Sequence, residues 1–165
     1  HVAARDEAEW VARNAKYPPA GRRGLETVML DADLGYADSL QYMAHANRET
    51  FVCIQIEDAE ALDHLDAILS VPGIDVLFIG PADLTASLGI PFQFTHPTYD
   101  DAVSRIARAA AKFGKWWGLP VPDGAAARRW AARGARFFNI GSDYSLLKSG
   151  FARIRQEFDQ AMAGE

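Results

Sequence analysis

Apolar and polar residues alternate along the chain with two different periods, which predict helices separated by short strands. Apolar side chains recur every three or four residues in several segments, as on one face of a helix. The predicted helices cover residues 4–16, 36–47, 59–70, 98–113, 124–133 and 144–163. Four short, nearly continuous apolar runs are typical of strands buried on both faces of a parallel sheet. The predicted strands cover residues 51–56, 74–79, 115–121 and 137–140.

This order of elements predicts repeated β–α units with a parallel sheet and right-handed crossovers. Four strands in 165 residues do not close an eight-stranded (β/α)8 barrel, which needs about 250 residues. An open, doubly wound sheet is the alternative. A nucleotide-binding version of that sheet has no support, because no G-x-G-x-x-G follows a strand and no Walker lysine is present.

Composition and charge exclude several classes of protein. The chain is 49% hydrophobic and 24% charged, as in ordinary globular domains, and its net charge of −5 disfavours a nucleic-acid-binding domain. No apolar run approaches the roughly 18 residues of a membrane-spanning helix. The single cysteine, Cys53, lies in an apolar run and is expected to pack as a small hydrophobic residue. One cysteine allows no intramolecular disulfide, which fits a reducing cytoplasm.

Acidic residues follow two neighbouring predicted strands. Glu57 comes directly after the first strand, and Asp83 lies in the Gly80-Pro81-Ala82-Asp83 segment after the second. Adjacent parallel strands are about 4.8 Å apart, so two carboxylates there repel each other unless they are protonated or share a cation. Oxygen ligands suit Mg²⁺ or Mn²⁺ better than zinc. The alternative is that Asp58 and Asp83 cap the elements that follow them.

Other polar groups at the same strand ends suit a carboxylate substrate. Gln55 lies two residues before Glu57, on the same face of its strand, where its amide can reach a substrate oxygen; the alternative is a core glutamine with its hydrogen bonds satisfied. The backbone amides of Ala82 and Asp83 suit a carboxylate. None of the four lysines lies at the carboxyl end of a strand, which disfavours a Schiff base and favours a metal Lewis acid.

Three motifs in consistent order carry a resemblance that spans nearly the whole chain. They are the segment 17–24 (YPPAGRRG), the segment 55–57 (QIE) and the segment 78–89, which contains FIGPADL and SLG. With these motifs the sequence resembles the HpcH/HpaI aldolase family, class II metal-dependent pyruvate aldolases acting on 2-keto-3-deoxy sugar acids and 4-hydroxy-2-oxo acids. The resemblance implies a (β/α)8 barrel, with residues 1–165 as a single incomplete domain. The chain would hold strands 5–8 and their flanking helices, the C-terminal part, and lack roughly the first three to four strands.

The resemblance also implies roles for individual residues. Glu57 and Asp83 would hold a divalent metal ion, Mg²⁺ or Mn²⁺ with Co²⁺ possible. Gln55 would bind substrate, and the amides of Ala82 and Asp83 would hold the pyruvate carboxylate. The histidine base and the arginine that the family needs belong to earlier strands, before His1, so no catalytic residue is assigned here.

The implied activity is retro-aldol cleavage of a keto acid to pyruvate and an aldehyde in a cytoplasmic homo-oligomer, a hexamer by resemblance. Its small-molecule partner is the keto acid, with no nucleic acid and no membrane. One alternative is a related pyruvate-enolate enzyme that decarboxylates and forms carbon–carbon bonds or cleaves an acyl-CoA. Another is a non-catalytic keto-acid-binding barrel. Because the chain begins at His1 rather than Met, it is expected to be incomplete and inactive alone. The aromatic-rich loop 89–97 and Trp116, Trp117 and Pro120 depart from the family pattern and leave the aldehyde open.

Overall fold

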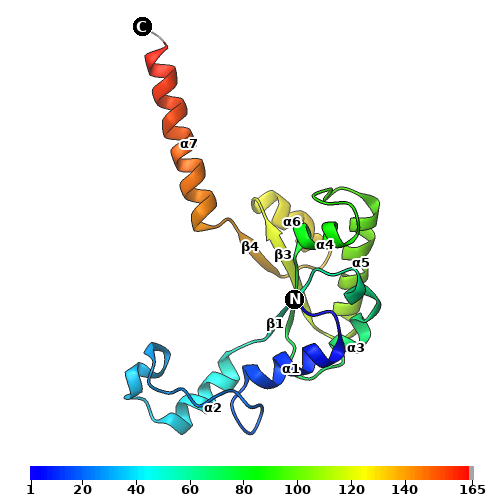
Figure 1. The fold of residues 1–165 in the computed structure, drawn as a ribbon, viewed down its shortest axis with the longest axis vertical. Helices are drawn as coiled ribbons and strands as arrows, with labels where there is room; N and C mark the ends of the chain where they lie inside the picture. Colours follow the sequence, from blue (N-terminus) through cyan, green and yellow to red (C-terminus); the bar gives the residue numbers. More distant parts are fainter. Residues whose placement is uncertain (164–165) are drawn as a thin grey trace.

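The protein is built on one four-stranded parallel sheet, with helices packed on one face (Figure 1). The computed structural model describes residues 1–163. The strands lie side by side in chain order, so each crossover returns to the neighbouring position. They are β1 (Cys53–Ile56), β2 (Val76–Ile79), β3 (Trp116–Val121) and β4 (Phe137–Ile140). The four predicted strands and their parallel arrangement are thus confirmed.

Seven α-helices and two short 3-10 helices occupy the described residues. They are α1 (Arg5–Ala15), η1 (Leu30–Gly35), α2 (Ser39–Glu49), η2 (Glu60–Asp63), α3 (Leu65–Leu69), α4 (Pro81–Ser87), α5 (Pro97–Lys112), α6 (Gly124–Ala132) and α7 (Asp143–Met162). The predicted helix 59–70 is divided at His64 into η2 and α3. The predicted helix 36–47 begins later, because Asp38 caps α2 by accepting a hydrogen bond from the Gln41 amide.

Helix α4 is an element that the periodicity does not predict. It begins at Pro81, which occupies the first helical position, where a missing N–H costs nothing and the ring favours a helical backbone angle. Its seven residues are too few for an apolar period to emerge from the sequence. Because α4 starts one residue after Gly80, it determines where the groups after β2 lie.

The hydrophobic core lies between the sheet and its helices. Alternate residues of β1, Ile54 and Ile56, are buried on that face, as are Leu77 and Ile79 of β2. They pack with one stripe of α5 and with α3, whose apolar spacing predicted these contacts. The fully buried members of the stripe and of α3 include Val103, Ile106, Ala110 and Ile68. This packing holds the carboxyl ends of β1 and β2 in fixed register.

The other face of the sheet is concave and strongly curled. Strands β1 and β4 are its two outer strands, about 14 Å apart if the sheet were flat. Yet the rings of Phe51, just before β1, and Phe137 of β4 lie edge to face with centroids 5.7 Å apart. Gln55, Cys53 and Trp116 are exposed on or beside this surface, Trp116 by 59%. The expectation that the strands are buried on both faces is met at Val76 of β2 but is wrong for β1, whose concave-face residues are exposed. The expectation that Cys53 packs as a small hydrophobic residue is wrong, because Cys53 is exposed.

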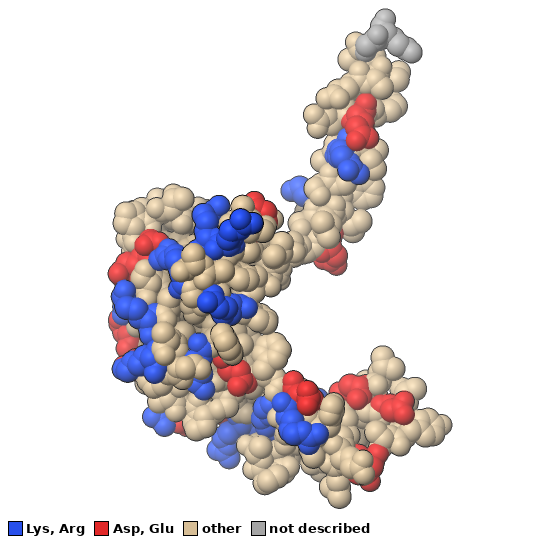
Figure 2. Space-filling model, turned by 180° about the vertical axis from the view of Figure 1, so that it is seen from behind, with Lys and Arg blue, Asp and Glu red and all other residues tan. Residues whose placement is uncertain are grey.

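Two parts of the chain project from the body (Figure 2). Helix α7 extends away from the sheet and contains no buried residue, although Leu147, Phe151, Ile154 and Phe158 keep the predicted apolar spacing. The segment 20–50 projects on the same side and exposes further apolar residues, including Leu30. The surface is hollowed between the two projections. Both projections expose apolar side chains within the described residues.

Candidate metal and keto-acid site

The carboxyl ends of β1 and β2 place Glu57 beside Gly80. Ile56 pairs with Ile79, and the Gly80 amide donates a hydrogen bond to the Ile56 carbonyl over 3.3 Å. The residue after each strand therefore lies at the same level of the sheet. Sequence alternation predicted Gln55 and Glu57 on one face of this strand, and the structure places both side chains beside the Cα of Gly80.

Glu57 carries a buried oxygen that the rest of the chain leaves unsatisfied. Its Oε2 atom has no hydrogen-bond partner among the described residues. A buried carboxylate oxygen without a partner is costly, and native proteins pair most such atoms with a donor, an ion or water. The oxygen is therefore suited to a cation or donor supplied from outside the chain.

Gly80 makes the space in which this oxygen sits. A Cβ atom at position 80 would overlap Glu57 Oε2 and would lie 2.7 Å from Gln55 Nε2 and 2.9 Å from Glu57 Cβ. Real Cβ atoms do not make such contacts, so only glycine lets both side chains approach the end of β2. The sequence pattern did not predict this role for Gly80; the signal was its place opposite an acidic strand end.

Gln55 lies on the concave face and is exposed. No side-chain hydrogen bond to it occurs among residues 1–163, so the alternative of a satisfied core glutamine is not observed. Its backbone carbonyl accepts the Val2 amide over 3.0 Å, which aligns the first residues of the chain with β1. The Gln55 amide is therefore available beside Glu57.

Asp83 lies one step further from the sheet than the sequence predicts. It occupies the first turn of α4 and is exposed, rather than sitting at the end of β2. The capping alternative is not observed, because Gly80 is the N-cap residue and no side chain caps α4. In the part of the chain that the structure describes, no ion pair joins Asp83 to a basic side chain. Within that part of the chain, no hydrogen bond or ion pair occupies the Asp83 carboxylate. The carboxylate is therefore available to a ligand.

The neighbouring Asp58 has a structural role instead. Its carboxylate accepts the Ser87 hydroxyl over 3.0 Å, and the Ser87 oxygen accepts the Ala59 amide over 2.9 Å. These bonds tie the segment after β1 to the end of α4. His1 lies close by, with Nδ1 3.8 Å from Glu57 Oε1 and Nε2 3.7 Å from Asp58 Oδ2.

The buried Thr85 fixes the loop that follows α4, beside the site. The sequence pattern did not predict this role for Thr85. The Thr85 hydroxyl donates to the Pro81 and Ala82 carbonyls over 2.8 and 2.9 Å, and its oxygen accepts the Phe92 amide over 3.0 Å. Thr85 is fully buried. The aromatic loop after α4 is thereby attached to the first turn of that helix, next to Asp83.

The donor set decides which ions fit this place. No group of three or more histidine, cysteine, aspartate or glutamate side chains converges within residues 1–163. A closed zinc site is therefore not formed by these residues. Carboxylate oxygens fit Mg²⁺ or Mn²⁺, which complete their shells with several water or substrate oxygens. The partnerless Glu57 oxygen and the cradle at Gly80 fit such an ion.

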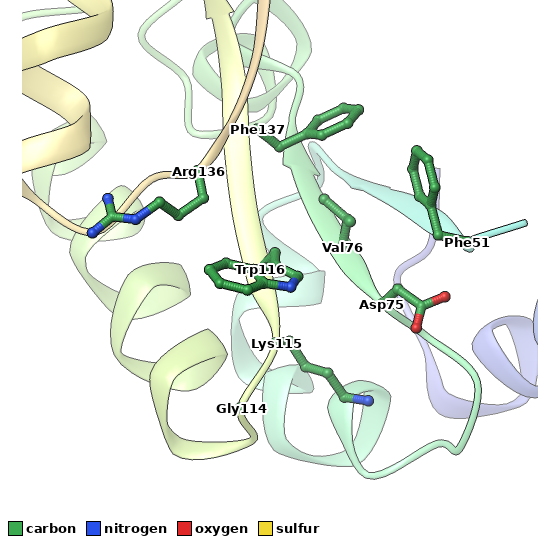
Figure 3. Close-up of a pocket in the computed structure, with 8 residues that line it drawn as sticks. All are labelled: Phe51, Asp75, Val76, Gly114, Lys115, Trp116, Arg136 and Phe137. Atoms are coloured by element: carbon green, nitrogen blue, oxygen red, sulfur yellow. The ribbon is translucent and has the colours of Figure 1, made fainter. Parts of the chain in front are cut away.

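A cavity lies at the opposite end of the sheet, where the strands begin, and is separate from this site (Figure 3). It measures about 590 Å³ and lies where the strands begin, with the rings of Phe51 and Phe137 turned toward each other and Trp116 and Lys115 below. Lys115 directly precedes β3 and lies at the amino end of the strand. This cavity lies at the amino ends of the strands, whereas Glu57 and Gly80 lie at the carboxyl ends of β1 and β2.

Comparison with known proteins agrees with this architecture. The HpcH/HpaI aldolase/citrate lyase family matches residues 1–149. The chain belongs to that family. A curated relative from Shigella dysenteriae, a 5-keto-4-deoxy-D-glucarate aldolase, is 34% identical over 157 residues, which are 95% of this chain and 60% of the relative. The chain thus spans about three fifths of the length of the curated relatives it matches.

Solved structures show the same relationship. An HpcH/HpaI aldolase/citrate lyase family protein from Burkholderia cenocepacia is similar with a TM-score of 0.84 and 32% identity, over 96% of this chain and 63% of that one. The citrate synthase SbnG is similar with a TM-score of 0.75 and 30% identity, over 96% and 62% of the two chains. The predicted fold class, the C-terminal part of a (β/α)8 barrel, is confirmed. In the described residues, no helix is both long and apolar enough to cross a membrane.

Proposed function

We propose that this chain carries the metal- and pyruvate-binding half of a class II aldolase. The reaction is retro-aldol cleavage of a 2-keto-3-deoxy sugar acid or a 4-hydroxy-2-oxo acid to pyruvate and an aldehyde. Family membership and the aldolase names of the curated relatives support the reaction class. The observation that carries the site is the buried, partnerless Glu57 oxygen facing the cradle at Gly80.

In this proposal Glu57 and Asp83 hold a divalent cation, Mg²⁺ or Mn²⁺, with Co²⁺ as a substitute. A cation bound there would act as a Lewis acid, stabilising the negative charge that develops on the keto oxygen of a pyruvate enolate. Glu57 is held in place by the end of β1, and Asp83 by the first turn of α4. Their separate backbone supports allow the two ligands to be fixed before substrate arrives.

The keto acid is oriented by groups on the same rim. The Gln55 amide donates to a substrate oxygen from the face that carries Glu57. The backbone N–H groups of Ala82 and Asp83 lie in the first turn of α4, where helical hydrogen bonding does not use them, and they receive the substrate carboxylate. We place the proton acceptor for the 4-hydroxyl group and the assisting arginine outside residues 1–165. Residues 1–165 would then be an incomplete domain, whose concave face the remaining strands of the barrel cover.

Pyruvate release tests this function directly. The complete gene product is incubated with a panel of 2-keto-3-deoxy acids and 4-hydroxy-2-oxo acids, and pyruvate is measured with and without chelator. The expected result is metal-dependent release that Mg²⁺ or Mn²⁺ restores. Pyruvate release that survives exhaustive chelation would contradict the metal assignment, and its absence across the panel would contradict the reaction.

Similarity to a citrate synthase supports a second candidate reaction of the same site. That relative is 30% identical, so an enzyme that joins the pyruvate-type enolate to a carbonyl acceptor is the alternative. Assays in the bond-forming direction distinguish the two. An aldolase condenses pyruvate with an aldehyde reversibly, whereas the alternative requires loss of CO₂ or of a thioester.

We also propose that the protein is a cytoplasmic homo-oligomer, with hexamers as the form that the resemblance implies. The support is the apolar face of α7, whose residues Leu147, Phe151 and Ile154 are all more than half exposed. Apolar patches of this extent mark interfaces. Light scattering of the complete gene product at micromolar concentration is expected to give a multiple of the subunit mass, and a monomer would contradict the proposal.

A further inference from the structure

A cavity distinct from the one in Figure 3 opens beside the first turn of α4, on the helical side of the sheet. It measures about 710 Å³, which is within the usual range for sites that take small organic ligands. Its lining residues come from the start of α5, the loop before α5, helix α6 and the carboxyl end of β3. Pro81 lines it, one residue from Gly80, so the cavity adjoins the candidate metal site without containing any of its proposed ligands.

The walls of this cavity are aromatic and already held in place. On one side the rings of Phe94 and Tyr99 lie edge to face with centroids 6.2 Å apart. On the other side the Trp130 ring lies edge to face against Trp117 at 6.4 Å. Pro120 at the end of β3 adds a rigid apolar rim. Because these rings are already held in place, binding does not require them to lose further conformational freedom. They therefore favour a flat or branched apolar group between them.

The charges around the cavity favour one anionic group. Its lining contains Arg129, Arg133 and Asp100, which sum to a net charge of +1. Arg133 is occupied, because it pairs with Asp100 at 2.5 Å, donates to Ser104 at 2.8 Å and lies over the Trp130 ring. Arg129 makes no hydrogen bond or ion pair within the described part of the chain. A single guanidinium therefore remains for a ligand carboxylate.

We propose that this cavity binds an apolar or aromatic monocarboxylate, with the ring between Phe94 and Trp130 and the carboxylate on Arg129. The same chemistry comes from two sources, the distal end of the keto-acid substrate or a separate carboxylate ligand. Polyhydroxylated chains fit less well, because the aromatic and proline walls leave sugar hydroxyl groups without partners. The site needs only the geometry of the described residues and stands whether or not the proposed reaction is correct.

Calorimetric binding to the complete gene product tests the site, with 3-phenylpropionate as the probe and 3-phenylpropanamide as its uncharged counterpart. The acid is expected to bind with a dissociation constant of about 1 mM or tighter, and the amide about fivefold more weakly. Arg129→Gln is expected to weaken binding of the acid about fivefold and to leave the amide unchanged. Arg128→Gln is the matched control, since Arg128 is the preceding residue of the same helix, does not line the cavity and carries the same charge.

A second variant tests the wall independently of the charge. Phe94→Ala removes a half-exposed ring without opening the core and is expected to weaken both probes about fivefold. Equal affinities for the acid and the amide would overturn the proposal, as would equal losses in Arg129→Gln and Arg128→Gln, or no binding at all.

Inhibition of pyruvate release identifies the source of the bound chemistry. Competition between 3-phenylpropionate and the keto acid assigns the cavity to the distal end of the substrate. Inhibition or activation that excess substrate does not relieve assigns it to a separate carboxylate. If no substrate releases pyruvate, the proposed aldolase reaction is contradicted. The calorimetric result still tests whether the cavity binds a carboxylate.

Discussion

The buried Oε2 oxygen of Glu57 lies where the Cβ of any residue other than glycine at position 80 would be. The two residues come from neighbouring strands, at the same level of the sheet. Gly80 is therefore needed to make room for the Glu57 carboxylate as well as to end β2. Among the described residues no donor reaches this oxygen, and the missing side chain at position 80 leaves the space that the oxygen occupies.

Replacing the Glu57 carboxylate tests the metal site most directly. Glu57→Gln removes one ligand charge while keeping the side-chain shape, so Mg²⁺ or Mn²⁺ affinity measured by calorimetry is expected to fall about 100-fold or more. Stability to urea is expected to stay within about 0.5 kcal/mol of the original or to rise, because a partnerless buried oxygen loses its charge. Asp58→Asn is the control, since its carboxylate accepts from Ser87. Unchanged metal affinity in Glu57→Gln would contradict the assignment.

Adding one methyl group at position 80 tests the cradle. Gly80→Ala is expected to displace Glu57 and Gln55, lower kcat/KM for pyruvate release more than about tenfold and cost about 1–3 kcal/mol of unfolding free energy. Gly124→Ala is the matched control, because a Cβ at position 124 meets no atom within 4 Å. A Gly80→Ala protein with normal activity would show that the two side chains are not held by this glycine.

Thr85 is expected to hold the aromatic loop at the rim. Thr85→Val keeps the volume but removes the hydroxyl, leaving the Phe92 amide without its acceptor and costing about 1–3 kcal/mol of unfolding free energy. Faster hydrogen exchange at the Phe92 amide is the local measurement. The exposed Thr98→Val is expected to change neither quantity. Equal exchange at Phe92 in the two variants would show that the hydroxyl does not anchor the loop.

Tyr99 predicts how stability changes at alkaline pH. Burial raises the pKa of Tyr99 to about 12, and Asp100 adds to the rise while Arg133 opposes it. Because the unfolded tyrosine ionises near pH 10, the folded state binds the proton more tightly, and stability is lost as the pH rises from about 10 to 12. The loss attributable to this group is about 2–3 kcal/mol over that window. Urea unfolding of Tyr99→Phe is expected to lack this component, and identical pH slopes in both proteins would contradict it.

Residues 1–165 expressed alone are expected to associate. The concave face exposes Phe51 and Trp116, and no further strand pairs with the outer edge of β4 among residues 1–163, which favours aggregation. Binding of a hydrophobic dye and a large, heterogeneous mass by light scattering are the expected results, without aldolase activity. A soluble fragment that melts cooperatively and releases pyruvate would contradict both this prediction and the placement of the catalytic base outside the chain.

The limits of the sequence prediction follow from the size of the elements. Long helices such as α5 and α7 were predicted nearly to their ends, because an apolar period repeats several times along them. The seven-residue α4 was missed, and the helix predicted over residues 59–70 is divided at His64. Local patterns do not record such short pieces, whose bounds depend on capping and on contacts with neighbouring elements. Asp83 was therefore predicted at a strand end and lies instead in the first turn of a helix.

The sequence by itself determined the alternation of strands and helices, the parallel sheet and the acidic residues after β1 and β2, since each of these is written in local periodicity and order. Only the tertiary structure decided that Gly80 makes room for Glu57, that Thr85 anchors the loop at Phe92, and that Arg129 of α6 lines a cavity together with Phe94 of the loop before α5. These relationships join residues from different strands, helices and loops. Their distances depend on how the sheet curls and how the helices pack against it, which no local pattern in the chain encodes.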